Sequence, residues 1–246
     1  AKGALGMIED GLLCDGPADA AFALHAWPGL PAGTVACRPG PCMAASDSFE
    51  VTIYGEGGHG ARPALAKNPL TVLAQILPVL EHMTTDTRVV SPCVARVGEK
   101  VNVIAETGAV SGTIRTLDPQ ERERTMQELR DRVASIAAEL GMRADVSFEL
   151  GCSGVSTDPR LYEMFREVGA YMLGAEHVLE LDKPSMGSED FGYFLDHMPG
   201  LMFRLGIGEN VPELHNPRFD FGDQALATAV RMMSGLAIRI CNGNLS

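Results

Sequence analysis

The chain has 246 residues, with 20 Lys and Arg against 32 Asp and Glu, so its formal net charge is −12. It contains no run of roughly 18 apolar residues that could form a membrane helix. An acidic chain without a basic cluster repels the phosphates of nucleic acids and of anionic lipids, so we expect neither nucleic acid nor membrane as a partner. Six scattered cysteines and first residues without a signal-peptide pattern predict a cytoplasmic protein with reduced thiols.

The beginning of the chain has α/β character. Residues 20–25 form an apolar run that ends in His25, which predicts a strand covered on both faces, as in a parallel sheet. Residues 27–31 contain Trp, Pro and Gly and predict a loop after that strand.

The middle of the chain predicts a strand, a helix, two strands, a helix and a strand. In chain order these elements span residues 49–54, 70–83, 89–97, 109–116, 119–140 and 144–150. Pro78 should kink the first helix or end its first part, and Asp118-Pro119 should cap the second. This order is typical of a ferredoxin-like split βαβ module with both helices on one face of the sheet.

The last third of the chain returns to α/β character. Asp158-Pro159 predicts the start of a helix that runs to about residue 173, and Ser188 can cap a short helix through residue 195. A strand over 201–205 and a helix over 223–240 follow. The sequence therefore predicts an α/β domain, formed by residues 1–46 and 157–246, that is interrupted by a ferredoxin-like α+β domain over residues 47–156.

The six histidines divide into two groups. Three lie beside acidic residues on polar helical surface, where a solvated structural role is favoured: His82, His177 and His197. His25 ends a strand, and ligands of open α/β sheets bind at the carboxyl ends of strands, although a satisfied core histidine is the alternative. His59 is flanked by glycines, which allow close approach to a ligand or simply form a turn. His215 lies in a turn-forming stretch, where its imidazole could bind a metal or form local hydrogen bonds.

Four other residues are candidates for substrate binding. Ser188 and Glu189 lie in a small-residue loop before the short helix and could bind a carboxylate, or they could be ordinary capping residues. Asn102 and Arg115 could hold a substrate carbonyl and carboxylate, and the alternative is a turn Asn and a surface Arg. The sequence has no G-x-S-x-G elbow and no Walker loop.

Seven segments in order along the chain resemble the M20 metallopeptidases, specifically the amidohydrolase branch of aminoacylases, hippurate hydrolases and auxin-conjugate hydrolases. They are Ala23-Leu24-His25-Ala26-Trp27-Pro28, Ala44-Ala45-Ser46-Asp47, Gly57-Gly58-His59-Gly60-Ala61-Arg62-Pro63, Asn102-Val103-Ile104, Gly112-Thr113-Ile114-Arg115, Met186-Gly187-Ser188-Glu189-Asp190-Phe191 and Glu213-Leu214-His215-Asn216-Pro217. The resemblance covers essentially the whole chain.

The resemblance implies a catalytic α/β domain that holds two divalent metals, zinc or manganese, and an inserted lid domain that forms a homodimer. By motif, His25 and His215 would be metal ligands, and His59 would stabilise the tetrahedral oxyanion, usually in the partner subunit's site. Asn102, Arg115, Ser188 and Glu189 would bind the substrate, a small N-acyl amino acid. A metal-bound water, assisted by a glutamate base, would attack the amide carbonyl.

The sequence also departs from the family pattern. The family's H-x-C-G-H-D and P-A-E-E segments are not found, since the chain contains no Cys-Gly-His or Glu-Glu. A catalytic metal needs about three protein ligands plus a water, and the motifs present supply only two histidines and no general base. Three readings therefore remain: a metal-dependent amidohydrolase, an incomplete chain that acts only as a dimerising module, and a weak esterase.

Overall fold

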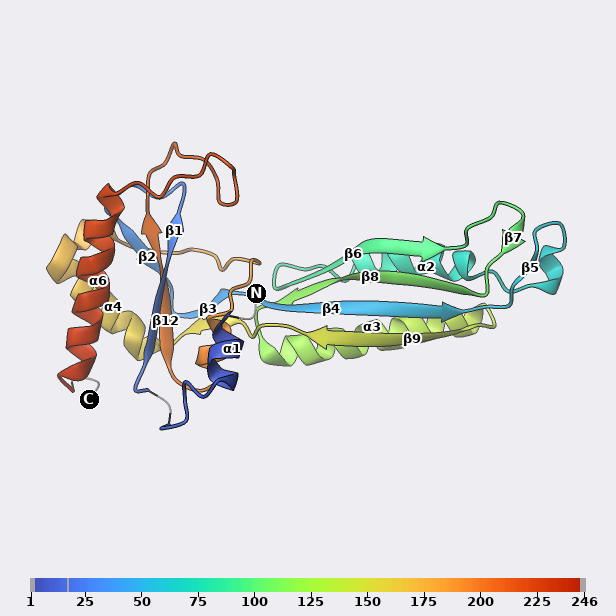
Figure 1. Ribbon diagram of the computed structural model, residues 1–246, viewed down its shortest axis with the longest axis horizontal. Helices are drawn as coiled ribbons and strands as arrows, with labels where there is room; N and C mark the ends of the chain where they lie inside the picture. The colour runs from blue at the N-terminus through green and yellow to red at the C-terminus, as the bar shows by residue number, and fades with distance from the viewer. Residues whose placement is uncertain (1–2, 17, 244–246) are drawn as a thin grey trace. The chain divides into compact units, whose positions relative to one another are not determined.

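The computed structural model describes residues 3–16 and 18–243. The chain divides into two compact units, which Figure 1 shows with their helices and strands. The larger unit comprises Ala1–Met43, Val155–Ser185 and Glu189–Ser246, and the inserted unit comprises Ala44–Gly154 and Met186–Ser188. The α/β fold class predicted from the sequence is confirmed.

A four-stranded mixed sheet forms the centre of the larger unit. Its order is β1 (Ala21–Trp27), β12 (Gly200–Gly206), β2 (Val35–Cys37) and β11 (Val178–Glu180). β1 is parallel to β12 and β11 is parallel to β2, but β12 and β2 are antiparallel. The expected burial of the first strand on both faces is wrong: only Ala26 of β1 is buried, because the strand lies at the edge of this sheet and has β12 as its one neighbour there.

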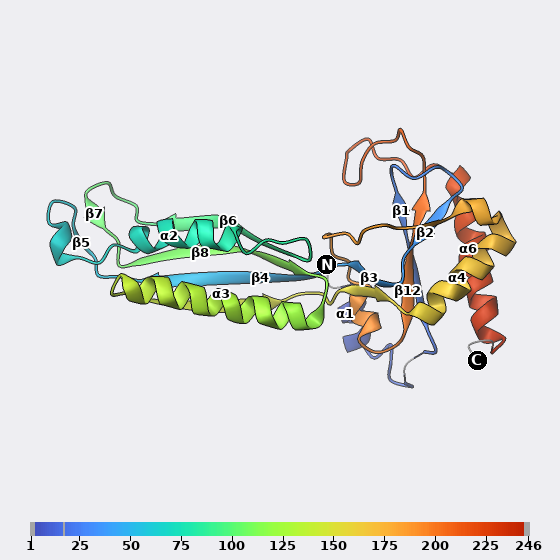
Figure 2. The same ribbon diagram turned by 180° about the vertical axis from the view of Figure 1, so that it is seen from behind.

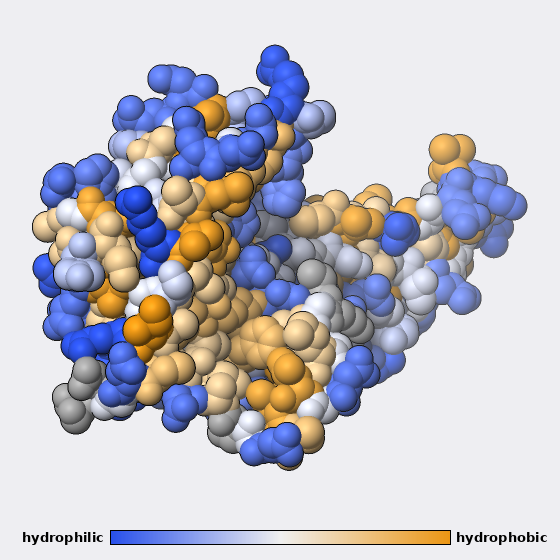
Figure 3. Space-filling model, turned by 60° about the vertical axis from the view of Figure 1, so that its left-hand side comes forward, coloured by the Kyte–Doolittle hydropathy of each residue, from blue (hydrophilic) through white to orange (hydrophobic). Residues whose placement is uncertain are grey.

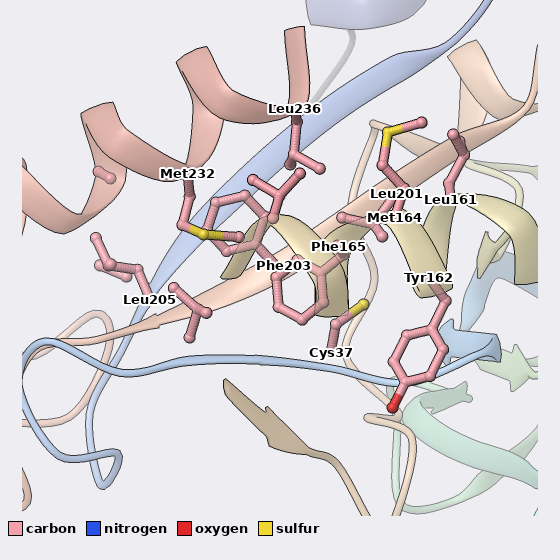
Figure 4. Packing of buried hydrophobic residues seen from close by; sticks show 14 of the residues in the cluster. Cys37, Leu161, Tyr162, Met164, Phe165, Leu201, Phe203, Leu205, Met232 and Leu236 are labelled. Carbon is pink, nitrogen blue, oxygen red and sulfur yellow. The ribbon is translucent and has the colours of Figure 1, made fainter. Parts of the chain in front are cut away.

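Two helices pack on one face of this sheet, α4 (Pro159–Leu173) and α6 (Gln224–Cys241). Figure 4 shows the core between them: Phe165 of α4 lies against Phe203 of β12, with ring centroids 5.5 Å apart, and Met232 and Leu236 extend from α6. Asp158 caps α4 as predicted, since its carboxylate accepts hydrogen bonds from the backbone N–H groups of the first turn. Large apolar side chains of α6 also reach the surface, and Figure 3 shows such hydrophobic patches among hydrophilic ones.

A smaller apolar cluster lies on the other side of the larger unit. It combines β3 (Gly40–Met43), which pairs antiparallel with β10 (Val155–Thr157), and α5 (Gly192–Leu195); α1 (Gly3–Glu9) packs beside α5. The capping role expected of Ser188 is wrong, because α5 begins at Gly192 and has no side-chain cap. No helix formed by residues 3–16 and 18–243 is long and apolar enough to cross a membrane.

The inserted unit has the element order that the sequence predicts. It runs β4 (Ala45–Tyr54), α2 (Pro69–Glu81), β6 (Arg88–Val97), β8 (Thr107–Thr116), α3 (Pro119–Glu139) and β9 (Arg143–Leu150). The strands pair antiparallel in the order β6-β8-β4-β9. Figure 2 shows α2 and α3 on one face of this sheet.

The alternation of side chains along β4 explains that arrangement. Phe49, Val51 and Ile53 are buried in one core with residues of α2 and α3, whereas the residues between them face away from the helices. Pro78 does not end α2, which continues to Glu81. The missing N–H of the proline removes one helical hydrogen bond, but Ile76 and Leu80 on either side of it are fully buried and hold the helix against the sheet.

Candidate functional site

His25 lies near the carboxyl end of β1, on the sheet face opposite α4 and α6. Phe22 and Leu24 pack toward the helices, so the alternation of the strand places His25 and Trp27 on the other face. The Nδ1 atom of His25 is 2.7 Å from the carbonyl oxygen of Ala26. A carbonyl only accepts, so Nδ1 donates and the lone pair of Nε2 remains available. Metal-binding histidines have this arrangement, with one ring N–H donated to a carbonyl and the other nitrogen on the metal.

Arg204 is a neighbour of His25 that the sequence reasoning missed. It lies on β12 in register with His25, and its guanidinium carbon is 3.7 Å from the centroid of the Trp27 ring. Trp27 in turn meets the His25 ring edge to face, with centroids 5.8 Å apart. Burial lowers the pKa of Arg204, and the thiols of Cys42 and Cys37 oppose that shift. The only signal in the sequence is a single cation within the otherwise apolar segment Gly200–Gly206.

His215 is exposed on a turn of the larger unit. It has a φ of 64°, and it is the one non-glycine residue with positive φ in the described part of the chain. Residues other than glycine rarely adopt this conformation, although His, like Asn and Asp, adopts it more often than most, and the surrounding turn holds it here. The amide of Asn216 donates to the carbonyl of Glu213 and closes that turn.

The residues present do not complete a metal site. Within residues 3–16 and 18–243 no three His, Cys, Asp or Glu side chains form a group that could hold a metal ion. His25 has the right tautomer, but two imidazoles are fewer than the about three protein ligands of a catalytic metal. The residue types fit a metal, whereas their number does not.

The segments of His59 and Asn102 meet at a small two-stranded sheet of the inserted unit. β5 (Gly58–His59) pairs antiparallel with β7 (Val103–Ile104), and the amide of Gly60 donates to the carbonyl of Asn102 at 2.8 Å. A Cβ at Gly60 would lie 3.1 Å from that carbonyl oxygen, which is a tight contact that would require a small shift of the backbone. The close pairing therefore favours a small residue at position 60.

The hydrogen bonding of His59 fixes the position of its proton. The backbone N–H of Ala61 donates to Nδ1 of His59 at 3.0 Å. An Nδ1 that accepts carries no proton, so in the neutral ring the proton is on Nε2. His59 is exposed, and its Nε2–H is a free donor that could meet a negatively charged oxygen.

Arg115 and Ser188 are also brought together in the inserted unit. Nη1 of Arg115, on β8, donates to the hydroxyl oxygen of Ser188. Glu189 belongs to the larger unit, where its carboxylate accepts from the amide of Asp190 at 3.0 Å, and it caps no helix, since α5 has no side-chain cap. The carboxylate of Asp190 accepts from the amide of Ala4. Of these residues, Arg115 and Ser188 together present the groups that could bind a carboxylate.

The thiols of Cys37 and Cys42 form a buried pair in the larger unit. The sulfur atoms of Cys37 and Cys42 are 3.6 Å and 3.1 Å from the hydroxyl oxygen of Thr157. A hydrogen bond from Cys37 lowers the pKa of Cys42 to about 6, with a further contribution from Thr157, although burial opposes the shift. The same hydrogen bond raises the pKa of Cys37, and burial adds to that rise. The sequence predicts only that both thiols are reduced, because nothing local shows that the two cysteines meet.

Comparison with known proteins gives the family. The model of the Peptidase family M20/M25/M40 matches residues 1–239, and the chain belongs to this family. It is 34% identical over 245 residues to an N-acetyldiaminopimelate deacetylase of Enterococcus faecalis, covering 95% of this chain and 63% of the relative. It is 31% identical over 254 residues to an N-acetyl-L-cysteine deacetylase of Bacillus subtilis, covering 98% of this chain and 58% of the relative.

The solved structures agree with that assignment. A Bacillus subtilis protein described as a dinuclear metal-binding peptidase of the M20 family superimposes with a TM-score of 0.84 and 27% identity. The match covers 96% of this chain and 61% of that one. The chain thus spans less than two thirds of the length of the curated relatives that it matches.

Proposed function

We propose that the protein hydrolyses the amide bond of N-acyl amino acids or related small amides. The observation that carries this proposal is the exposed Nε2–H of His59, which the hydrogen bond from Ala61 defines. Amide hydrolysis passes through a tetrahedral oxyanion, and a donor positioned for that oxygen lowers the barrier. Two of the relatives, which are 31% and 34% identical, are named as deacetylases of N-acetyl amino acids.

Other residues of the chain have binding roles in this proposal. Arg115 would hold the substrate carboxylate with its planar guanidinium, with Ser188 as a second polar contact and Glu189 beside it. Asn102, whose carbonyl accepts from Gly60, would present its side-chain amide to the substrate carbonyl.

A divalent metal, zinc or manganese, would polarise the amide carbonyl and lower the pKa of a bound water. His25 and His215 would be two of its ligands. The described residues do not complete the site, and the roles of His59, Arg115 and Asn102 rest on their own hydrogen bonds.

The proposal includes a homodimer formed through the inserted unit, with His59 serving the partner subunit's site. Three exposed apolar side chains occur in the segments around His59: Leu65 at 75%, Val101 at 110% and Val103 at 50% of full exposure. Exposed apolar groups close together are typical of interaction surfaces. Light scattering at micromolar concentration should give twice the mass of one chain, and a monomer would exclude this arrangement.

An alternative function is a dimerising module that does not hydrolyse amides. The lack of a three-ligand group among the described residues favours it. A weak esterase that uses His59 alone is a further outcome, and such activity would be insensitive to chelators.

The test is hydrolysis of a panel of N-acetyl amino acids, measured as release of the free amino acid, with added zinc or manganese and with a chelator. We expect metal-dependent release that His59→Ala reduces by about 100-fold or more. The matched control is His82→Ala, an exposed histidine at the end of α2, which should retain full activity. Unchanged turnover in His59→Ala would exclude the oxyanion role.

A further inference from the structure

Arg204 and Trp27 form a cationic platform next to His25. Arg204 and His25 are register partners on the parallel strands β12 and β1, two residues before each strand ends. Met202 packs on the side of the sheet away from α4 and α6, so alternation places Arg204 on the same face as His25. Ligands of α/β sheets bind at the carboxyl ends of strands, and this platform lies at such an end.

The guanidinium of Arg204 is held without a carboxylate partner. Arg88 and Arg122 of the inserted unit each pair with carboxylates, whereas no carboxylate of the described residues lies within 4.0 Å of a nitrogen of Arg204. The side chain is half-buried and its guanidinium lies over the indole of Trp27. A stacked, partly desolvated guanidinium still has its N–H donors directed outward in the plane of the group, where they can bind an anion.

The residue of β12 that pairs with Trp27 leaves space for Arg204 to stack on the indole. The register partner of Trp27 is Gly206, which has no side chain to cover the indole. A Cβ at Gly206 would lie 2.1 Å from the carbonyl oxygen of Pro31, so this position is restricted to glycine. The tight backbone packing at the end of β12 therefore keeps the space beside the Trp27 ring open to the side chain of Arg204.

We propose that Arg204, stacked on Trp27, binds a carboxylate of the substrate beside His25. The substrates preferred by the enzyme would then carry a carboxylate on the amino-acid side chain in addition to the α-carboxylate. A bidentate pair between guanidinium and carboxylate gives both charge and geometry for selecting such substrates. The inference rests on the proposed function for the identity of the ligand as an N-acyl amino acid.

Trp27 makes the test direct, because it is the only tryptophan in the chain. Its fluorescence is recorded while N-acetyl-L-aspartate, or its neutral-side-chain analogue N-acetyl-L-asparagine, is added to the 246-residue protein. We expect N-acetyl-L-aspartate to bind about tenfold to hundredfold more tightly, as is typical when a charge-assisted hydrogen-bonded pair is formed. Equal affinity for the two ligands would overturn the proposal.

Two variants of Arg204 assign the effect to its side chain. Arg204→Met should remove the preference, and Arg204→Lys should retain part of it, because an ammonium keeps the charge but not the fork. The control is Arg231→Met, an exposed arginine of α6, which should preserve the preference. If Arg204→Met weakens both ligands equally, Arg204 binds a group that they share and the second-carboxylate proposal is wrong.

Measuring both binding and hydrolysis distinguishes failure of the Arg204 proposal from failure of the proposed function. Tight, Arg204-dependent binding of N-acetyl-L-aspartate, without hydrolysis of this ligand or of any other N-acetyl amino acid of the panel, would overturn the proposed function and leave the carboxylate site. Hydrolysis of both ligands at equal rates and with equal affinity would support the proposed function and overturn the role of Arg204. If Arg204→Met does not fold, as judged by circular dichroism, the comparison of the two ligands on the unaltered chain and on Arg204→Lys still decides.

Discussion

Asp47 and Arg122 form a two-point ion pair between the start of β4 and the first turns of α3. Nε of Arg122 donates to one carboxylate oxygen of Asp47 at 2.8 Å, and Nη2 donates to the other. The latter oxygen also accepts from the amide of Gly151 at 3.0 Å. The Asp47 side chain is 0% exposed and that of Arg122 is 19% exposed. Asp47, near the start of the inserted unit, is therefore hydrogen-bonded both to α3 and to Gly151, near the end of the unit.

The first prediction concerns the strength of this pair. Asp47→Asn removes the negative charge and leaves the Arg122 guanidinium partly buried against a neutral group. We expect the free energy of unfolding to fall by about 3–5 kcal/mol, the usual effect of breaking a buried pair, as measured by urea denaturation. Asp145→Asn, in the exposed pair with Arg143, is the control and should cost less than about 1 kcal/mol. Similar losses in both variants would contradict the role given to Asp47.

A second prediction concerns Gly112 of β8. A Cβ there would lie 2.1 Å from the carbonyl oxygen of Ser91 and 2.7 Å from the ring of Phe49. Gly112→Ala must therefore separate β8 from β6 or displace a core ring, and we expect it to destabilise the chain by about 2 kcal/mol or more. The control is Gly29→Ser in a loop, where a Cβ meets nothing within 4 Å; its positive φ costs about 1 kcal/mol. A Gly112→Ala protein with an unchanged denaturation midpoint would refute the packing argument.

Metal binding at His25 gives the third prediction. The His25 ring lies 5.8 Å from that of Trp27, so an ion on Nε2 should change the fluorescence of the only tryptophan. We expect zinc to produce a saturable change that His25→Asn removes and His82→Asn preserves. Affinity should be weak in comparison with that of catalytic sites that have about three protein ligands. The absence of any change in the unaltered protein would count against His25 as a ligand.

The sequence predicts those parts of the fold in which burial is periodic. The alternation of Phe49, Val51 and Ile53 and the cap at Asp118 are local signals, and the structure places β4 and α3 where they indicate. Short strands such as β3 and β10 were missed, because they have only three or four residues and pair with each other across more than a hundred residues of chain. Their hydrogen bonds depend on the rest of the fold and leave no pattern in either segment.

The candidate site likewise has a part that the sequence predicts and a part that it does not. The positions of His25 and His59 could be singled out because a strand end and a glycine loop are visible in the sequence, and the meeting of His59 with Asn102 follows from the pairing of β5 with β7. The contact of Arg204 with Trp27 could not be predicted, because it depends on the pairing of β1 with β12. Nothing in one strand of a parallel pair indicates the register of the other.

The last prediction concerns the dependence of stability on pH. In the folded chain the pKa of Cys42 is about 6, below the value of 9.0 for a free thiol, because Cys37 and Thr157 hydrogen-bond to its sulfur. Between these two pH values the unfolded chain binds a proton that the folded chain does not, so the free energy of unfolding rises with pH. The contribution of Cys42 is fully present above pH 9, and it disappears as the pH falls through about 6.

Cys37 titrates in the opposite direction. Its pKa is raised in the folded chain, so its effect begins only above the pKa of the unfolded thiol, where the unfolded chain loses a proton that the folded chain keeps. We therefore expect urea denaturation to show stability rising from pH 6 to about pH 9 and then falling. Thr157→Val removes the hydroxyl that contacts both sulfur atoms and should flatten the rise. The control is Cys93→Ala, at an exposed thiol, which should leave the rise of stability with pH unchanged. If stability rises equally steeply in Thr157→Val, the pH dependence comes from other groups.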